Sequence, residues 1–320
     1  MGNSSISIVI CTLDRSDFLS KVMFTISSWG DCFQELIVVS GSSQDETELV
    51  LGQYKYIINK VIYTDQRNVS VARNLGLYAA SQEIIIYLDD DVIPPQDWVK
   101  LHLIAYSEQR FNCACVAGKV IDKTNPNFSL QFAHGVSSKL SESRPVLSEA
   151  VASLYLSNPD WFTAIMGANA SYKREALIRI GGFDEFFEYF LEETDVCLRL
   201  QLAGYTVDYI DVSVDHYVQP SHNRRDRRHL TCWYSLAKNT TYFALKHSLK
   251  TMPLPIFLVR LTLLLTHRCI LRILRLKFTH NLPVSLLGKY IQDVIAGIRY
   301  GWDAGIKLNQ IDDFMGESKK

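Results

Sequence analysis

The sequence predicts an α/β protein with a Rossmann-like, doubly wound sheet and a helical C-terminal region. Short apolar runs alternate with stretches of helical periodicity through the first half of the chain. The runs are apolar on both faces, which is typical of parallel strands covered by helices. The alternation of strand and helix implies a layer of this kind. Beyond about Leu230 the pattern is helical to the end.

The first half of the chain supplies four expected strands and three expected helices. Asn68 or Ser70 is a suitable N-cap for the third helix, since either side chain can accept from the first free backbone N–H groups. The strands are expected at Ile6–Cys11, Glu35–Ser40, Ile57–Tyr63 and Glu83–Leu88, and the helices at Phe18–Ser28, Thr47–Gln53 and Val69–Ala80.

The second half is less regular. Phe111–Asp160 is rich in turn residues, so we expect further strands joined by long loops. From Ala176 to Gly204 we expect two helices separated by the Gly181-Gly182 pair, followed by a strand at Thr206–Ile210. The expected domains are therefore an α/β domain, 1–230, and a helical region, 231–320.

Composition excludes several classes of protein. Of 320 residues, 48% are hydrophobic and 21% charged, so the chain can form a packed core and is not a disordered protein. The net charge of −1 gives no indication of nucleic-acid binding. Seven scattered cysteines predict free thiols in a reducing compartment. The first residues lack the pattern of a secretory signal, and we expect a cytoplasmic protein.

Three consecutive carboxylates follow the fourth expected strand directly. Asp89, Asp90 and Asp91 would repel one another at a strand exit, where ligands bind in open α/β sheets. Asp89 and Asp91 lie on one side of an extended chain and can reach one cation, and their hard oxygens favour Mg²⁺ or Mn²⁺. The alternatives are a solvated turn before Pro94-Pro95 and a phosphoacceptor aspartate.

A second acidic cluster follows about a hundred residues later. Glu192 and Glu193 stand directly after a run of aromatic residues, and burial beside aromatic rings raises a carboxylate pKa into the range of a general base. Asp195 falls in the first turn of the next expected helix, where the helix dipole favours it. The alternative is a charged helix N-terminus without a catalytic role.

Together these segments resemble the family 2 glycosyltransferases, which have the GT-A fold. The resemblance covers roughly Ile6 to His216, about two thirds of the chain. It depends on several segments in the order of the family: Ile8–Arg15 (first strand and nucleotide loop), Ala72–Gly76 (the ARNxG helix), Leu88–Asp91 (the DXD metal motif), Gly167–Ala170 (the acceptor-side segment), and Gly181–Glu185 with Glu192–Arg199 (the GGFDE…EDxDLxxR block).

The resemblance implies a mechanism. An inverting, single displacement transfers a sugar from a nucleoside diphosphate to an acceptor hydroxyl, with one carboxylate as base. We assign that role to Glu193, with Glu192 in reserve, while Asp195 orients the helix or an acceptor group. The expected product is a polysaccharide or a glycolipid.

The donor side is assigned in the same way. The residues expected to bind the donor are Thr12, Asp14, Arg15, Ser40, Arg73, Asp89 and Asp90. Arg73 can add a charge-assisted contact to phosphate. A metal on Asp89 and Asp91 would neutralise the leaving diphosphate, and in some GT-A enzymes a histidine in the position of His216 joins the metal. The alternative for a lone histidine is a structural role.

Two positions depart from the family pattern. Ser40-Gly41 stands where the family often has acids after its second strand, one of which contacts the nucleotide base, so the donor base is left open. Glu193 stands where the family has the catalytic aspartate, and its side chain is longer by one methylene.

An aromatic pair and a basic segment each allow two interpretations. Trp161 and Phe162 line the acceptor site or belong to the core. The basic segment His222–His229 is a solvated loop, or a flap over diphosphate or phosphorylated lipid.

The stretch Pro253–Phe278 is apolar but carries five basic residues within an arc of about 140° on a helix. It is too interrupted for a transmembrane helix. We expect either a basic amphipathic helix on the cytoplasmic face of an anionic membrane or a helix packed on the catalytic domain.

Two other functions remain open at this point. One is a nucleotidyltransferase acting on sugar phosphates, although the first loop has no glycine-rich, basic phosphate segment. The other is a nucleotide-sugar-binding protein without activity, which the Ser40-Gly41 departure favours and the two carboxylate clusters disfavour.

Overall fold

The computed structural model describes residues 5–107, 112–124, 127, 129–219, 232–280 and 283–317. The chain divides into two compact units. Unit 1 comprises residues up to 136, 144–188 and 192–218, and unit 2 comprises 137–143, 189–191 and the chain from 219 onwards. Two short segments of the N-terminal part therefore belong to the helical unit. Each cysteine is a free thiol, as expected.

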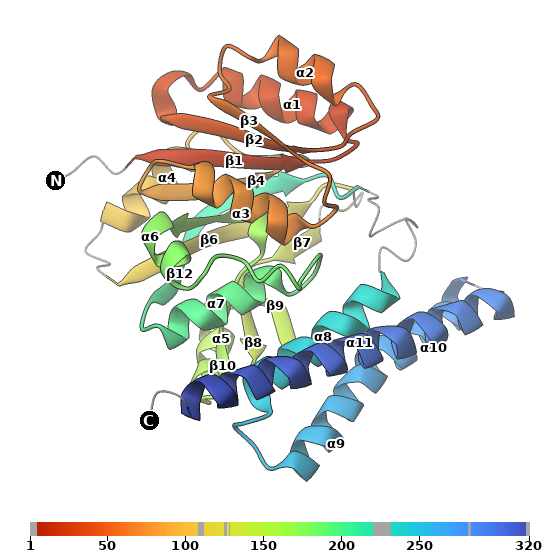
Figure 1. Ribbon diagram of the computed structural model, residues 1–320. Helices are drawn as coiled ribbons and strands as arrows, with labels where there is room; N and C mark the ends of the chain where they lie inside the picture. Colours follow the sequence, from red (N-terminus) through yellow and green to blue (C-terminus); the bar gives the residue numbers. More distant parts are fainter. Residues whose placement is uncertain are drawn as a thin grey trace. The chain divides into compact units, whose positions relative to one another are not determined.

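A mixed sheet forms the centre of unit 1 (Figure 1). Its order is β3-β2-β1-β4-β11-β6-β12-β5, and β7 pairs with β6. The first four strands are parallel, while β11 is antiparallel to both of its neighbours. The strands are β1 (Ile6–Thr12), β2 (Glu35–Gly41), β3 (Lys60–Thr64), β4 (Ile84–Asp89), β5 (Val92–Ile93), β6 (Cys113–Asp122), β7 (Ser129–Phe132), β11 (Ala170–Lys173) and β12 (Thr206–His216). This arrangement confirms the predicted fold class.

Helices cover both faces of this sheet because its strands are apolar on both sides. Ile6, Ile8 and Ile10 of β1 pack with residues of α1 and α4 in one core cluster. Val9 points to the opposite face and contacts α3 at Gly76, where a Cβ atom would lie 2.3 Å from a Val9 methyl carbon. The helices of unit 1 are α1 (Ser16–Ser27), α2 (Thr47–Gln53), α3 (Val69–Ala79), α4 (Trp98–Ser107), α5 (Glu149–Leu156), α6 (Arg174–Arg179) and α7 (Glu192–Leu202).

Most of the predicted elements are present, with shifted ends. Asn68 caps α3, and its side chain accepts from the backbone N–H groups of Ser70 and Val71. The strand expected at Ile57–Tyr63 starts later, at Lys60. The strand expected at Thr206–Ile210 continues to His216, with a register shift between Tyr209 and Ser213. A small second sheet has the order β10 (Trp161–Ala164), β8 (His134–Ser138), β9 (Ser143–Leu147).

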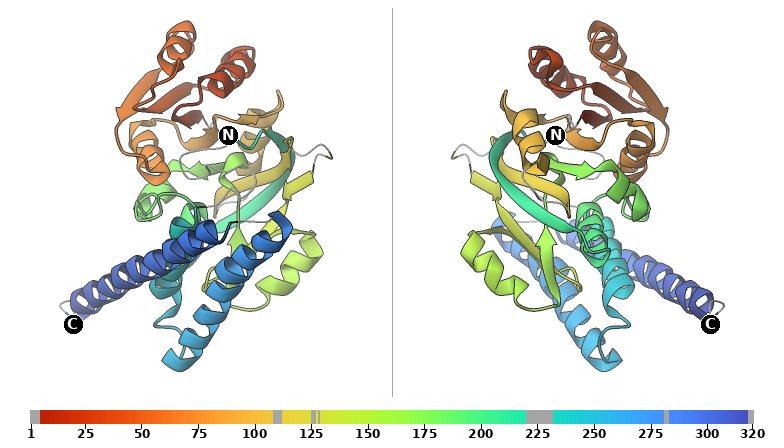
Figure 2. Two further views of the ribbon diagram at one scale, coloured as in Figure 1. Left: turned by 90° about the vertical axis from the view of Figure 1, so that its right-hand side faces the viewer. Right: turned by 90° about the vertical axis from the view of Figure 1, so that its left-hand side faces the viewer.

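Unit 2 is helical, as predicted, and its two best-packed helices are α8 (Trp233–Ser248) and α11 (Val284–Glu317). Gly297, Gly301 and Gly305 recur every four residues on α11 and let it approach α8. A Cβ atom at Gly301 would lie 2.3 Å from the carbonyl oxygen of Lys238. The remaining helix is α9 (Leu254–Leu265), a π-helical turn (Thr266–Leu271) and α10 (Arg272–His280), which run on as one rod in Figure 2.

Candidate active site

The strand ends of the sheet bring distant polar residues together. Thr12 ends β1 beside Ser40 of β2, and Cys11 pairs with Asp89 at the end of β4. Because parallel strands end at the same edge, the first loop and the acidic triplet share one side of unit 1. The Thr12 hydroxyl donates to Asp90 Oδ2 at 2.8 Å, which closes the contact between them.

Arg15 neutralises two of the three aspartates. Its Nη1 lies 2.7 Å from Asp90 Oδ1 and 2.9 Å from Asp91 Oδ2. Burial raises the pKa of Asp90 to about 6, although the charge of Arg15 opposes the increase. Arg15 therefore holds Asp90 and Asp91 together, and a direct contact with donor phosphate stays a prediction.

Arg73 joins the two acidic clusters. Its Nη2 lies 3.6 Å from Asp89, and its Nη1 lies 3.3 Å from Glu192 and 2.9 Å from Glu193. The guanidinium lies 5.4 Å from the ring of Phe183. One buried cation thus connects residues that are more than a hundred positions apart. Its contacts are with carboxylates, and its expected contact with phosphate stays a prediction.

Local contacts explain why these side chains meet. Asn74, next to Arg73 on α3, donates to the carbonyl of Phe183 and accepts from its N–H, so α3 is tied to the Gly181-Gly182 turn. Arg199 of α7 binds Asp195 at 2.6 Å and donates to the carbonyls of Ile180 and Gly182. The buried Asp195 therefore holds Arg199 of α7 beside that turn, and the orienting role expected for Asp195 stays a prediction.

The two glutamates have different surroundings. Glu192 is 4% exposed, and burial together with the charge of Glu193 raises its pKa to about 8. Its Oε2 has no hydrogen-bond partner within the described part of the chain. The side chain of Glu193 is 17% exposed and paired with Arg73. Glu192 is thus suited to stay protonated at neutral pH, whereas Glu193 can meet an acceptor.

Gly167 makes room for this pair. It begins a short 3₁₀ turn (Gly167–Asn169) in the segment expected on the acceptor side. A Cβ atom there would lie 2.1 Å from Glu193 Oε1 and 2.9 Å from Arg73 Nη2. The resemblance marked this segment, but the steric requirement could not be read from the sequence.

Asp91 and His216 form the part of the site best suited to a cation. His216 Nε2 lies 3.3 Å from Asp91 Oδ1, and Nδ1 lies 2.8 Å from Gln131 Oε1. If Nδ1 donates to Gln131, Nε2 presents its lone pair toward the carboxylate, which is the arrangement of a metal-binding histidine. Two adjacent octahedral ligands at about 2.1 Å from a metal lie about 3 Å apart, so the pair fits Mg²⁺ or Mn²⁺.

Asp89 completes the predicted metal set less directly. Burial raises its pKa, and the charges of Asp91 and Glu193 add to the increase while Arg73 and His216 oppose it. Among the described residues no group of three or more His, Cys, Asp and Glu side chains is already arranged around one point. A metal bound by Asp89, Asp91 and His216 stays a prediction.

The expected nucleotide loop is tied to the segment after β2. Asp14 has a φ of 53°, and its carboxylate accepts from the N–H of Gln44 at 2.7 Å. Asp45 accepts from the N–H of Ser16, at the start of α1, at 2.7 Å. Ser40 is buried and its hydroxyl donates to the carbonyl of Gly41. These contacts position the loop, but they do not identify the nucleotide base.

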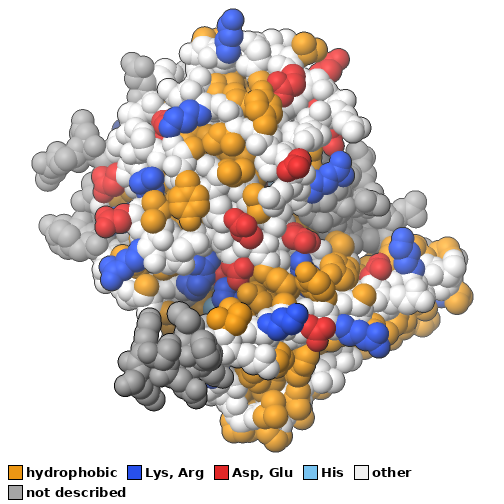
Figure 3. Space-filling view, viewed as in Figure 1, with side chains coloured by type: hydrophobic (Ala, Val, Ile, Leu, Met, Phe, Trp, Pro, Cys, Tyr) orange, Lys and Arg blue, Asp and Glu red, His pale blue; other side chains and the backbone are white. Residues whose placement is uncertain are grey.

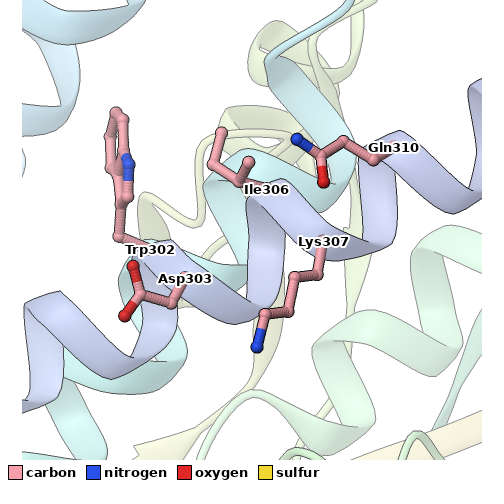
Figure 4. Close-up of a pocket in the computed structure, with 5 residues that line it drawn as sticks. All are labelled: Trp302, Asp303, Ile306, Lys307 and Gln310. Atoms are coloured by element: carbon pink, nitrogen blue, oxygen red, sulfur yellow. The ribbon is translucent and has the colours of Figure 1, made fainter.

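The remaining candidates fall in different places. Phe162 is a core residue, 5% exposed, whereas Trp161 is half-buried and its ring packs against that of Tyr155 at a tilt of 52°. The basic segment His222–His229 lies outside the described residues. A hollow on unit 2 is lined by Trp302, Asp303, Ile306, Lys307 and Gln310, which all come from α11 (Figure 4). It lacks the paired carboxylates of the site and has no part in it.

The chain is similar in sequence to known glycosyltransferases. The model for glycosyl transferase family 2 matches residues 7–181, and one described as the N-terminal domain of galactosyltransferase matches 150–223. A chondroitin synthase of Escherichia coli is 24% identical over 69% of this chain and 36% of its own length. A pre-mycofactocin glycosyltransferase of Mycobacterium tuberculosis is 26% identical over 58% and 37%. The chain thus spans about a third of these relatives.

Two solved structures share the fold. GalNAc-T7 with UDP, GalNAc and Mn²⁺ has a TM-score of 0.56 at 14% identity and covers 77% of this chain and 48% of its own. The mannosyltransferase PcManGT of Pyrobaculum calidifontis, in complex with GDP-Man and Mn²⁺, has a TM-score of 0.55 at 16% identity, with coverages of 96% and 87%.

Proposed function

Because this chain belongs to glycosyl transferase family 2 and is a glycosyltransferase, we propose that it transfers a sugar from a nucleoside diphosphate to an acceptor hydroxyl with inversion, and that Glu193 is the base. The observation that carries the proposal is the position of Arg73, which lies between Asp89 and Glu193. The donor-side aspartates and the base therefore belong to one site within unit 1.

The donor side is the strand edge of β1, β2 and β4. We assign donor contacts to Thr12, Asp14, Arg15 and Ser40, with Asp89 and Asp90 beside them. Asp89, Asp91 and His216 would hold Mg²⁺ or Mn²⁺, which supplies positive charge to a leaving diphosphate. The two fold relatives crystallised with Mn²⁺ support a divalent ion.

The acceptor would bind beside the exposed part of the Glu193 side chain. Its carboxylate takes the proton of the acceptor hydroxyl as the new carbon–oxygen bond forms and the bond to the diphosphate breaks. Glu192 keeps its proton at neutral pH, so it does not add a second negative charge. Arg73 holds the Glu193 carboxylate during this step and fixes its direction.

The proposed acceptor and product follow from the family. A saccharide or lipid-linked acceptor, in polysaccharide or glycolipid synthesis, agrees with the family. The chain lacks the usual acid at Ser40, so a panel of donors is needed rather than uridine nucleotides alone.

The test begins with the purified chain, nucleoside diphosphates and Mn²⁺ in a thermal-shift assay. One diphosphate should raise the melting temperature only with the metal present. With the matching sugar donor, Glu193→Gln should lower turnover by about 10²–10⁴-fold while diphosphate binding is unchanged.

Glu192→Gln is the matched control and should retain most activity, since Glu192 is already neutral. The configuration of the product at the anomeric carbon, measured by NMR, tests inversion. Normal turnover by Glu193→Gln would remove this residue from the mechanism.

A further inference from the structure

The rod of α9, the π-turn and α10 in unit 2 is apolar but not buried. Leu254–Thr279 has a mean hydropathy of 1.7 over its most apolar 18 residues, and only 22% of that window is buried. A core helix of this composition would be mostly covered by its neighbours. Most of this apolar surface therefore has no partner within the described part of unit 2.

One narrow stripe of the rod does pack inside unit 2. Phe257, Leu261, Leu265, Cys269 and Ile273 are buried at four-residue intervals in the core with α8 and α11. In a regular α-helix, residues four apart advance by about 40° each time. The wider π-turn at Thr266–Leu271 offsets this drift and keeps the stripe facing one way.

The other side of the rod exposes large apolar side chains. They belong to both α9 and α10, and in Figure 3 hydrophobic side chains gather over the place where Figure 1 draws α9. Their exposed fractions run from 40% for Leu258 and Leu274 to 64% for Leu263 and 84% for Phe278. The full set is Leu254, Ile256, Leu258, Val259, Leu263, Leu271, Leu274 and Phe278.

The segment that carries this surface has cations and no acids of its own. Residues 232–292 contain no aspartate or glutamate. The same stretch contains nine lysines and arginines: Lys238, Lys246, Lys250, Arg260, Arg268, Arg272, Arg275, Lys277 and Lys289. Glu142, from another segment of unit 2, binds Arg260. The other cations of the stretch, with the exposed apolar side chains, complement a bilayer that carries anionic lipids.

The same charges argue against two other occupants. A second copy of the chain would bring two cationic surfaces together in a symmetric interface. A spanning helix would have to place Arg268 in hydrocarbon, but Arg268 is bound to Ser141 and Thr240 within unit 2. The buried stripe also keeps one side of the rod in protein contact along its length.

We propose that the exposed side of α9 and α10 lies in the headgroup region of an anionic bilayer, with its apolar side chains inserted. The cytoplasmic leaflet carries such lipids, so the enzyme would act at the cytoplasmic face of a membrane. Arg260 and Arg268 are held by Glu142 and Ser141, whereas Arg275 is exposed and available to lipid phosphate. The proposal is independent of the sugar transferred.

The experiment is flotation of the purified 320-residue chain with phosphatidylglycerol-containing vesicles and with pure phosphatidylcholine vesicles. We expect binding to the anionic vesicles to be at least tenfold stronger and to weaken in 0.5 M salt. Leu263→Ser with Phe278→Ser should weaken it about tenfold. The matched control, Leu49→Ser with Leu154→Ser, changes side chains on unit 1 that are 63% and 73% exposed and should bind as the parent does.

Several results would overturn the proposal. Equal binding to both kinds of vesicle would do so, as would unchanged binding by the Leu263/Phe278 variant. Resistance to alkaline carbonate extraction would indicate a spanning helix instead. Dimerisation in sedimentation without vesicle binding would assign the surface to a second copy. Circular dichroism melting of each variant shows that a lost interaction is not lost folding.

Discussion

Gly167→Ala tests the close approach between the 3₁₀ turn and the base. The new Cβ atom would lie 2.1 Å from Glu193 Oε1, while ordinary contact begins near 3.4 Å. The carboxylate must therefore move by about 1.3 Å, the difference between these two distances. The backbone need not change, because Gly167 is not among the glycines with positive φ.

The expected loss follows from this displacement. A misplacement of about 1 Å at a reacting group costs about 10²-fold in rate, or about 2.7 kcal/mol in the barrier. We expect kcat to fall by this factor. Donor binding should stay within threefold of the parent, since the proposed donor contacts lie at the strand edge. The assay is release of nucleoside diphosphate from the sugar donor, with binding measured by calorimetry.

Two further variants test whether the displacement of Glu193 causes the loss. Gly52→Ala, which meets no atom within 4 Å, is the matched control and should keep full activity. Gly167→Ala with Glu193→Asp shortens the base by one methylene and should recover part of the lost rate relative to the single changes. A kcat for Gly167→Ala within threefold of the parent would show that Glu193 does not act from the position described.

Two other predictions concern stability. The pKa of Glu192 is about 8 in the folded state, which is above its unfolded value. Between these two values the folded protein binds one more proton than the unfolded chain. The free energy of unfolding should therefore fall as pH rises from 5 to 8, by up to about 1.4 kcal/mol per pH unit. Glu192→Gln should flatten this slope in urea titrations, and an unchanged slope would assign it to other groups. Gly301→Ala should lower the free energy of unfolding by about 1–3 kcal/mol in the same assay, because its Cβ meets the Lys238 carbonyl, while Gly288→Ala on the same helix meets nothing within 4 Å. Equal stability of these two variants would contradict the close packing of α8 and α11.

The sequence predicts the first half of the fold well because local pattern and tertiary role agree there. Each of β1, β2 and β4 contains a run of at least four consecutive apolar residues, and each is buried on both faces. β11 has only four residues. It lies between β4 and β6 and pairs with both, although these strands are distant from it in sequence. No local periodicity encodes such an insertion, so the order of the second half could not be predicted.

The candidate site shows the same difference between what local sequence predicts and what depends on contacts distant in sequence. Residue types and order predict roles for Asp89, Asp91 and Glu193, since carboxylates are unusual at those places, and these roles stay predictions. The pairing of Arg15 with Asp90 and Asp91, and the contact of Gln131 with His216, depend on the three-dimensional path of the chain. The structure also changes the interpretation of the basic arc predicted for Pro253–Phe278. Two of its five residues, Arg260 and Arg268, bind side chains and backbone of unit 2.

The π-turn at Thr266–Leu271 makes the number of residues in this segment more important than their identity. Exchange of one apolar side chain for another leaves the direction of α10 as it is. Insertion of a single residue into α9 would rotate everything after it by about 100°. Ile273 would then leave the interior and a cation would enter it, so engineering of this region should preserve length before composition.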